Sequence, residues 1–288
     1  MATRPSLPYY APDEILPSPI PSVEEILASP CLFPPHFCDH SLHRVGDHFM
    51  VKHGRSTGAL LQEGENMLFV EQSTSVLLVP KVYAIFSDEK TNKDFLVMEY
   101  ISGKPLADIW RNALPSHKEN ITSQFRRGLD ELRSIPSPGY YGGIWRQPIR
   151  DSNFRNKTLK GPCEDPAISG PHETEEQWID AMWLCVKMMK DRRWLNQLPR
   201  IRKDYHVVFK GEYKPVFTHA DLSLDNVMLR DDGVVVVIDW ERSGWYPSYW
   251  EYCSARMRDE PWTEELSMML DEYISLVAWI KQHQEEIY

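Results

Sequence analysis

One stretch of the chain concentrates the residue types that phosphoryl transfer requires. Residues 216–251 read VFTHADLSLDNVMLRDDGVVVVIDWERSGWYPSYWE, so that four residues separate Asp221 from Asn226 and a β-branched run ends at Asp239. Phosphoryl transfer needs a carboxylate near the attacking hydroxyl and oxygen ligands that hold Mg²⁺ on the nucleotide phosphates. Asp221 is suited to the first task. Asn226 and Asp239 are suited to the second, because both offer oxygen ligands. Asp239 ends a strand that is expected to be buried, and a buried carboxylate needs a partner such as a hard cation.

Four motifs along the chain resemble those of one enzyme family in the same order. HADLSLDN resembles the catalytic loop of the aminoglycoside phosphotransferase and choline kinase-like family, which has a protein-kinase-like fold, and IDWE resembles its metal-binding segment. FMVKHG resembles the strand with the phosphate-binding lysine, and LLQEGENM the helix whose glutamate pairs with that lysine. FLVMEYISGKPL resembles the segment between the lobes, and IPSPGYYGG and SGWYPSYWEY are similar to fungal members. The resemblance covers residues 40–285.

The resemblance implies catalytic and metal-binding roles for the residues of the first stretch. Asp221 would accept or orient the proton of the substrate hydroxyl, and Asn226 and Asp239 would bind magnesium. His219 would brace the loop and take no part in the chemistry. The implied cofactors are therefore ATP and Mg²⁺.

The resemblance also implies how the nucleotide is held. Lys52 would contact the α and β phosphates of ATP, and Glu63 would hold that lysine, with Glu65 as the second choice. The backbone from Glu99 to Ile101 would meet the adenine.

The turn that would cover the phosphates departs from the protein-kinase pattern. HRVGDH contains one glycine, Gly46, where protein kinases have G-x-G-x-x-G. This difference leaves open a non-catalytic nucleotide-binding scaffold of the pseudokinase type. A protein kinase is the other alternative, but no A-P-E segment follows Asp239, which favours a small-molecule acceptor over a protein.

The elements around these residues predict an α+β, bilobal fold with a small β-rich N-terminal lobe and a larger, mainly helical C-terminal lobe. Residues 1–39 hold six prolines before position 22 and are expected to form an extended tail or an arm laid on the surface, with a short helix that Ser22 caps. Residues 40–103 predict the nucleotide-binding lobe, in the order strand, strand, helix, strand, strand. Residues 104–288 predict the catalytic and substrate-binding lobe, with helices over 117–135, 173–190 and 262–285, an irregular stretch over 136–172, and strands around the catalytic loop.

Charge and composition exclude several classes of function. The chain has 32 basic and 42 acidic residues, a net charge of −10, which argues against nucleic acid or an anionic membrane surface as the main partner. No segment approaches the roughly 20 apolar residues of a membrane span. Five cysteines without a C-x-x-C spacing predict no disulfide framework and a cytosolic protein. The cluster of Cys31, His36, Cys38, His40 and His43 lacks a zinc-finger spacing, so packed thiols and surface histidines are expected there.

The acidic excess lies mostly near the C-terminus. From Glu241 onward the chain has ten acidic and four basic residues, a net charge of −6. Because the C-terminal lobe of the resembling family holds the acceptor, Glu241 and Glu251 are candidate contacts to a cationic substrate. The sequence therefore predicts an ATP- and Mg²⁺-dependent phosphotransferase that acts on a hydroxyl of a small molecule, for which an amino sugar or amino alcohol is one option.

Overall fold

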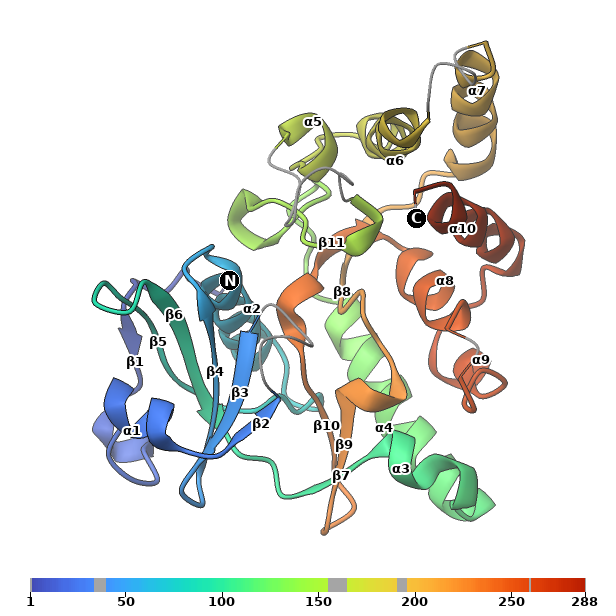
Figure 1. The fold of residues 1–288 in the computed structure, drawn as a ribbon. Coiled ribbons are helices and arrows are strands. Elements are labelled where there is room, and N and C mark those ends of the chain that lie inside the picture. Colours follow the sequence, from blue (N-terminus) through green and yellow to red (C-terminus); the bar gives the residue numbers. More distant parts are fainter. Residues whose placement is uncertain (1, 34–39, 155–164, 191–195, 259, 288) are drawn as a thin grey trace. The chain divides into compact units, whose positions relative to one another are not determined.

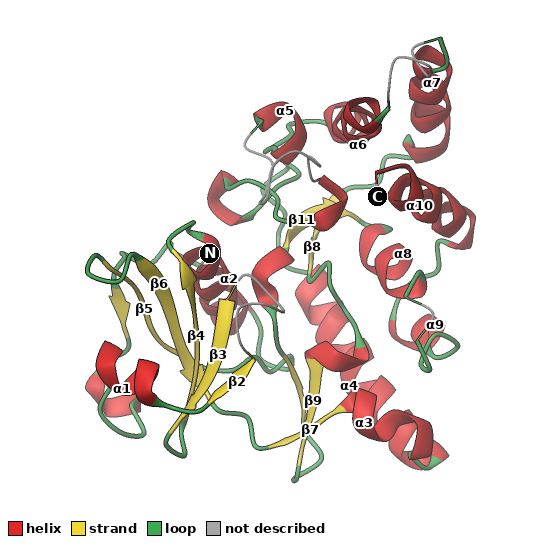
Figure 2. Cartoon of the chain, viewed as in Figure 1, coloured by secondary structure: helices red, strands yellow, loops and turns green. Residues whose placement is uncertain are grey.

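The computed structural model describes residues 2–33, 40–154, 165–190, 196–258 and 260–287. The chain forms two compact units, one of Met1–Ile109 with Asp225–Glu241 and one of Trp110–Leu224 with Arg242–Tyr288 (Figure 1). Strands outnumber helices in the first unit, and helices outnumber strands in the second (Figure 2). The predicted α+β fold, with a β-rich N-terminal part and a helical C-terminal part, is confirmed.

The first unit is built on a six-stranded antiparallel sheet of order β1-β5-β6-β4-β3-β2. The two strands predicted on either side of the Gly46 turn are confirmed, and so are the helix and the two strands predicted after them. The strands are β1 (Tyr9–Tyr10), β2 (Cys31–Phe33), β3 (His40–Val45), β4 (Phe49–Arg55), β5 (Val82–Asp88) and β6 (Lys93–Glu99).

The N-terminal segment is an arm laid on the first unit, and it also contributes two strands that its prolines do not predict. Tyr9 and Tyr10 pair with β5, and Cys31 and Phe33 pair with β3, so both edge strands of the sheet come from this segment. Proline is tolerated beside edge strands because one side of such a strand needs no partner. The short helix α1 (Val23–Ala28) begins at Ser22 with a capping box to Glu25, as the N-cap prediction requires.

Strand alternation gives the six-stranded sheet two different faces. Phe49, Val51, Ala84 and Val97 point to the face that the N-terminal segment covers through Ala11 and Ile26. The intervening residues point to the face covered by helix α2 (Ala59–Ser73). Lys52 and Leu96 are cross-strand partners on that second face, which places the lysine on the helix side of the sheet.

A second, three-stranded sheet of order β10-β9-β7 completes the first unit. It contains β7 (Gly103–Pro105), which precedes helix α3 (Leu106–Ile109), and the hairpin of β9 (Val227–Arg230) and β10 (Val235–Val237). This pairing joins residues 225–241 to the first unit. The division of the chain therefore differs there from the predicted lobes 40–103 and 104–288.

The second unit consists of helices around a two-stranded sheet of β8 (Pro215–Thr218) and β11 (Gly244–Pro247). The helices are α4 (Pro115–Arg133), α5 (Pro166–Ser169), α6 (Glu175–Met189), α7 (Leu198–Phe209), α8 (Trp250–Arg256), α9 (Leu266–Met269) and α10 (Ile274–Ile287). The helices predicted over 117–135 and 173–190 are confirmed. The single helix predicted over 262–285 is wrong, because the chain is extended at Leu270 between α9 and α10. Leu270 and Leu276 are both buried across this break, so the apolar pattern continues through it.

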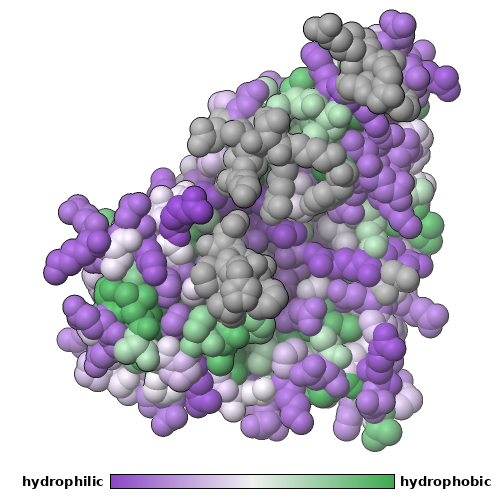
Figure 3. All heavy atoms as spheres, in the orientation of Figure 1, coloured by the Kyte–Doolittle hydropathy of each residue, from purple (hydrophilic) through white to green (hydrophobic). Residues whose placement is uncertain are grey.

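Aromatic side chains fill the core of the second unit around Trp178, which is fully buried and contacts the rings of Phe154, Tyr246 and Trp250. The predicted irregular stretch over 136–172 is confirmed in its described residues, and residues 155–164 lie outside them. Hydrophilic side chains, in purple, predominate on the face drawn in Figure 3. Within the described ranges, no helix combines the length and the apolar character needed to cross a membrane.

Candidate active site

Lys52 lies at the centre of a buried charge cluster in the first unit. Strand β4 directs it toward α2, where its Nζ lies 2.6 Å from Glu63 Oε1 and 2.7 Å from Asp239 Oδ1. Only 6% of Lys52 is exposed. Burial by itself lowers the pKa of Lys52, but the two carboxylates outweigh burial and raise this pKa above its usual value. Lys52 is therefore a charged lysine held at a fixed position.

Glu63 is the glutamate of α2 that meets this lysine. Its side chain is fully buried, and in the described part of the chain its Oε2 has no hydrogen-bond partner. Burial, opposed by Lys52 and assisted by Asp239 and Glu241, raises the pKa of Glu63 to about 7. Glu65, the second choice, lies two positions further along the helix and instead pairs with Arg4 at 2.8 Å. Residues two positions apart do not share a helix face, so α2 brings only the first of them to Lys52.

The β9–β10 hairpin brings together the two predicted magnesium ligands. Val227 pairs with Val237, and the Ile238 amide donates to the Asn226 carbonyl at 2.9 Å, so Asn226 and Asp239 lie at the same end of the hairpin. Asp239 has a φ of +66°, an unusual backbone conformation for a non-glycine residue.

The chemistry of these two side chains fits Mg²⁺. A carboxylate and an amide carbonyl are hard oxygen donors, and Mg²⁺ sites in nucleotide enzymes use one or two such groups together with phosphate oxygens. Across the described ranges, no group of three or more His, Cys, Asp and Glu residues is arranged to hold a metal. The binding of Mg²⁺ by Asn226 and Asp239 stays a prediction.

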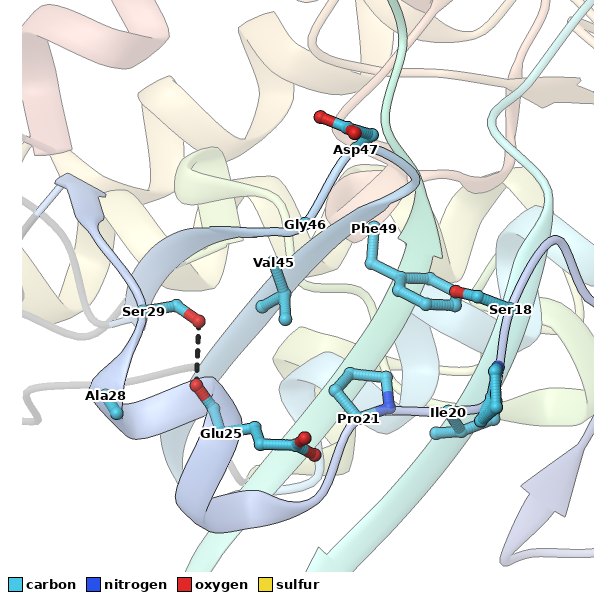
Figure 4. Close-up of a pocket in the computed structure, with 11 residues that line it drawn as sticks. Ser18, Ile20, Pro21, Glu25, Ala28, Ser29, Val45, Gly46, Asp47 and Phe49 are labelled. Carbon is cyan, nitrogen blue, oxygen red and sulfur yellow. Dashed lines mark hydrogen bonds between the residues drawn. The ribbon is translucent and has the colours of Figure 1, made fainter.

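The turn at Gly46 joins β3 to β4, and Gly46 has a φ of +59° that favours glycine. Beside it lies a hollow of about 560 Å³ between this turn and the N-terminal segment (Figure 4). Val45 and Phe49 line it from the hairpin, and Ile20 and Pro21 from the N-terminal segment. The charged residues of its lining are the acidic Glu25 and Asp47. The nucleotide contact of the Gly46 turn stays a prediction.

The segment predicted to meet adenine follows β6. Glu99 ends that strand and accepts a hydrogen bond from the Lys81 amide through Oε2 at 3.2 Å, and Ile101 is buried. The Tyr100 amide donates to the His48 carbonyl at 2.8 Å, which ties this segment to the β3–β4 turn. The adenine contact itself stays a prediction.

The second unit carries the predicted catalytic aspartate in the loop after β8. Asp221 is 6% exposed, and its Oδ1 accepts from Arg242 Nη1 at 3.1 Å and from Arg258 Nη2. The Asp221 amide donates to His219 Nδ1 at 3.3 Å, which agrees with a bracing role for that histidine. Ala220, between them, has a φ of +65°. The two arginines were not among the predicted site residues. The sequence signal that could have pointed to them is that HADLSLDN contains aspartates but no lysine or arginine to pair with them.

Glu251 has a different position from the substrate surface expected for it. This glutamate of α8 is 1% exposed, and its two oxygens accept from the backbone amides of His219 at 2.6 Å and Ala220 at 3.1 Å. Burial raises the pKa of Glu251 to about 7, although the hydrogen bonds from these amides lower it. Glu251 therefore holds the backbone of the loop after β8, and it is too deeply buried for the substrate surface expected of it. Glu260 likewise accepts from the Leu224 amide in the same loop, at 2.8 Å.

Glu241, the other candidate substrate contact, lies in the one-turn helix Trp240–Arg242 and is partly exposed. Its charge contributes to the raised pKa of Glu63, so it belongs to the electrostatic surroundings of the lysine cluster. Its contact with a substrate stays a prediction.

The cysteine and histidine cluster near the N-terminus is described only in part. Cys31 is exposed and free, and His43 lies 3.2 Å from His53, measured between their Nε2 atoms. His36 and Cys38 lie outside the described residues.

Most of the chain matches the model of a known family. A family model described as "Phosphotransferase enzyme family" matches residues 43–280. No curated protein matches the chain.

Several solved structures share the fold. The GDP and kanamycin complex of APH(2")-IIia is 14% identical, with a TM-score of 0.58, over 87% of this chain and 82% of that one. The streptomycin-ATP-APH(2")-IIa ternary complex is 14% identical, with a TM-score of 0.55, over 91% and 93% of the two chains. The apo form of a thermostable mutant of aminoglycoside phosphotransferase APH(4)-Ia is 13% identical, with a TM-score of 0.51, over 86% and 83%. At this identity the likeness shows the fold, and the predicted kinase-like fold is confirmed.

Proposed function

The chain belongs to the phosphotransferase enzyme family, and we propose that it transfers the γ-phosphate of ATP to a hydroxyl of a small molecule with the help of Mg²⁺. The observation that carries this proposal is the position of Lys52 Nζ between Glu63 and Asp239, at 2.6 and 2.7 Å. A buried lysine held by two carboxylates of different elements is the arrangement expected of a phosphate-binding lysine and its partners.

The first unit would bind the nucleotide. Lys52 contacts the phosphates, and Glu63 fixes the direction of the lysine side chain. Asn226 and Asp239 would hold Mg²⁺, whose chemistry is the neutralisation of negative charge on the phosphates. ATP is the proposed donor. Among the structures of similar fold, APH(2")-IIia forms a complex with GDP and APH(2")-IIa forms one with ATP, so a nucleotide of either kind binds to this fold.

The second unit would act on the acceptor. Asp221 accepts the proton of the attacking hydroxyl, and its position depends on the loop backbone before it. Glu251 accepts hydrogen bonds from the two amides that precede Asp221, and His219 accepts from the Asp221 amide itself. These contacts hold the base in one place, which favours transfer because positioning supplies much of the catalysis in this chemistry.

The net charge of −10 supports a small-molecule acceptor over nucleic acid or an anionic membrane surface. A cytosolic location stays a prediction, supported by the cysteine content. Among the described residues, Cys31, Cys185 and Cys253 form no disulfide, and Cys38 and Cys163 lie outside the described residues.

Transfer of label from γ-labelled ATP to a panel of hydroxyl compounds tests the proposal. We expect the wild type to gain thermal stability with ATP and Mg²⁺ and to label an acceptor. Asp221→Asn should retain nucleotide binding but lose about 10²- to 10⁴-fold in kcat, the range of a removed general base. Lys52→Met should weaken nucleotide binding, whereas Lys90→Met, at an exposed lysine in the β5–β6 turn, should not.

Two results would contradict the proposal in different ways. A wild type that binds ATP but labels no acceptor, with Asp221→Asn indistinguishable from it, would indicate the non-catalytic scaffold. If ATP does not raise the thermal stability of the wild type, or if it raises that of Lys52→Met equally, nucleotide binding at Lys52 is rejected.

A further inference from the structure

A buried hydrogen bond joins helix α2 to the segment that follows strand β10 in the first unit. Asn66 Nδ2 donates to the Trp240 carbonyl at 2.8 Å, and both residues are fully buried. The two residues lie 174 positions apart in the sequence, so the fold alone brings them together. Trp240 directly follows Asp239, the proposed magnesium ligand. The bond therefore attaches α2 to the backbone beside that ligand.

The backbone at Asp239 depends on its surroundings for support. Its φ of +66° lies in the left-handed region, which a residue other than glycine rarely adopts. Such a conformation is unfavourable by itself and persists where the surrounding structure holds it, often at a functional site. The contacts on either side of Asp239 are therefore expected to set the direction of its carboxylate.

Hydrogen bonds hold the chain both before and after Asp239. Before it, the Ile238 amide donates to the Asn226 carbonyl at 2.9 Å. After it, the indole Nε1 of Trp240 donates to the last carbonyl of β10 at 2.9 Å, and the Trp240 carbonyl accepts from Asn66. The first two bonds stay within the β9–β10 hairpin and the residues next to it. The bond from Asn66 is the one that ties this segment to the helix.

Helix α2 presents two side chains to the same cluster. Glu63 and Asn66 are three residues apart, so they lie on one face of the helix. Glu63 accepts from Lys52 at 2.6 Å, while Asn66 holds the backbone after Asp239. Lys52 Nζ in turn lies 2.7 Å from Asp239 Oδ1. One helix thus fixes both the lysine and the segment of the proposed metal ligand.

We propose that Asn66 is a positioning residue for the metal: through the Trp240 carbonyl it fixes the direction in which Asp239 presents its carboxylate to Mg²⁺. This inference rests on the proposed function, because it takes Asp239 as a magnesium ligand. A side-chain amide suits this task, since it donates to a carbonyl without adding a charge beside the metal. Residues that orient metal ligands in this way contribute about 10- to 100-fold to metal affinity or activity.

The alternative is that Asn66 only stabilises the packing of α2, and metal binding by the full chain separates the two roles. The probe is Mn²⁺, which takes the same oxygen ligands as Mg²⁺, added to the complex with ADP and followed by electron paramagnetic resonance. Asn66→Leu keeps most of the volume but loses the donor, whereas Asn66→Gln keeps an amide. The matched control is Val70→Ala, one turn further along α2 and also fully buried.

We expect Asn66→Leu to raise the Kd of Mn²⁺ in the ADP complex by about tenfold or more. The Kd of ADP without metal should change by less than about twofold, because Glu63 continues to hold Lys52. Asn66→Gln should retain part of the metal affinity. Val70→Ala should retain all of it, although the lost methyl groups lower the free energy of unfolding. In turnover, the Mg²⁺ concentration that gives half of the maximal rate should rise in Asn66→Leu by the same factor as the Kd of Mn²⁺.

An unchanged Kd of Mn²⁺ in Asn66→Leu would overturn the inference and leave the proposed transferase function in place. An equal rise in Asn66→Leu and Val70→Ala, or an equal rise in the metal-free Kd of ADP, would overturn it in favour of packing alone. If the wild type with ADP binds no Mn²⁺, or if Asp239→Asn binds it equally well, the proposed metal ligand itself is rejected, and the inference with it. Where Asn66→Leu does not fold, Asn66→Ala takes its place with the same expected results.

Discussion

Gly64 lies on α2 between Glu63 and Glu65, where the helix packs closely against the sheet. A Cβ atom at this position would lie 2.6 Å from Ile85 Cδ1, 2.8 Å from Ile85 Cγ1 and 3.0 Å from Leu96 Cδ1. Because non-bonded carbons prefer about 3.5–4.0 Å, Gly64→Ala should push the helix outward by roughly 1 Å. The 2.6 Å bond from Lys52 to Glu63 would then exceed hydrogen-bonding distance.

The expected magnitudes follow from two opposing effects of Gly64→Ala. Alanine in a helix interior stabilises by about 1 kcal/mol relative to glycine, whereas overpacking of a core costs about 1–3 kcal/mol. We expect the free energy of unfolding to fall by about 1 kcal/mol. Loss of the charge-assisted bond to Lys52, worth about 1.5–3 kcal/mol, should weaken ATP binding by about tenfold or more.

Urea denaturation and ATP titration of Gly64→Ala, Ile85→Ala and the double variant test this reasoning. Ile85→Ala alone should cost about 2–5 kcal/mol, because it leaves a cavity under the helix. The methyl group added at position 64 fills part of that cavity, so the double variant should be more stable than the sum of the single changes by about 1 kcal/mol. A Gly64→Ala variant that gains stability and binds ATP as the wild type does would refute the proposed role of the close approach.

Three further predictions concern positions outside this contact. Gly103→Ala should lower the melting temperature by several degrees, because Gly103 has a φ of +156° and a Cβ would lie 2.3 Å from the Leu229 carbonyl oxygen. Arg4→Ala should lower the free energy of unfolding by about 1 kcal/mol in urea denaturation, since Arg4 pairs with the buried Glu65 but is itself half exposed. Burial raises the pKa of Glu251 from 4.5 to about 7, so the folded protein keeps a proton that the unfolded chain releases between these pH values. The free energy of unfolding should therefore fall by at most about 3 kcal/mol from pH 4.5 to 7, measured relative to Glu251→Gln at each pH.

Each of these predictions has an outcome that would contradict it. A Gly103→Ala variant with wild-type melting would mean that β7 accommodates a side chain at this position. If Arg4→Ala is as stable as the wild type, the N-terminal segment does not stabilise α2 through the ion pair of Arg4 with Glu65. A difference between the wild type and Glu251→Gln that does not vary from pH 4.5 to 7 would show that the pKa of Glu251 is the same in the folded protein as in the unfolded chain.

Local patterns in the sequence predicted the elements that carry the nucleotide half of the candidate site. The alternation in FMVKHG predicts a strand with Lys52 on it, and the 3.6-residue recurrence after it predicts the helix of Glu63. The strands predicted around the catalytic loop form the hairpin that places Asn226 and Asp239 at one end. These features depend on neighbouring residues, so the sequence expresses them directly.

The tertiary structure decided which of the candidate groups touch. β1 and β2 join the sheet through backbone hydrogen bonds at its edges, and such pairing leaves little trace in the side-chain pattern. The same holds for the break before α10, where burial continues although the helix does not.

The roles of charged side chains show the same division. Residue types and order by themselves determined the family, the fold class and the set of acids suited to phosphoryl transfer. Only the fold assigned Glu251 to the loop backbone and brought Arg242 and Arg258 to Asp221. The physical reason is that burial and ion pairing join residues distant in sequence, and composition reports the number of charges without reporting their partners.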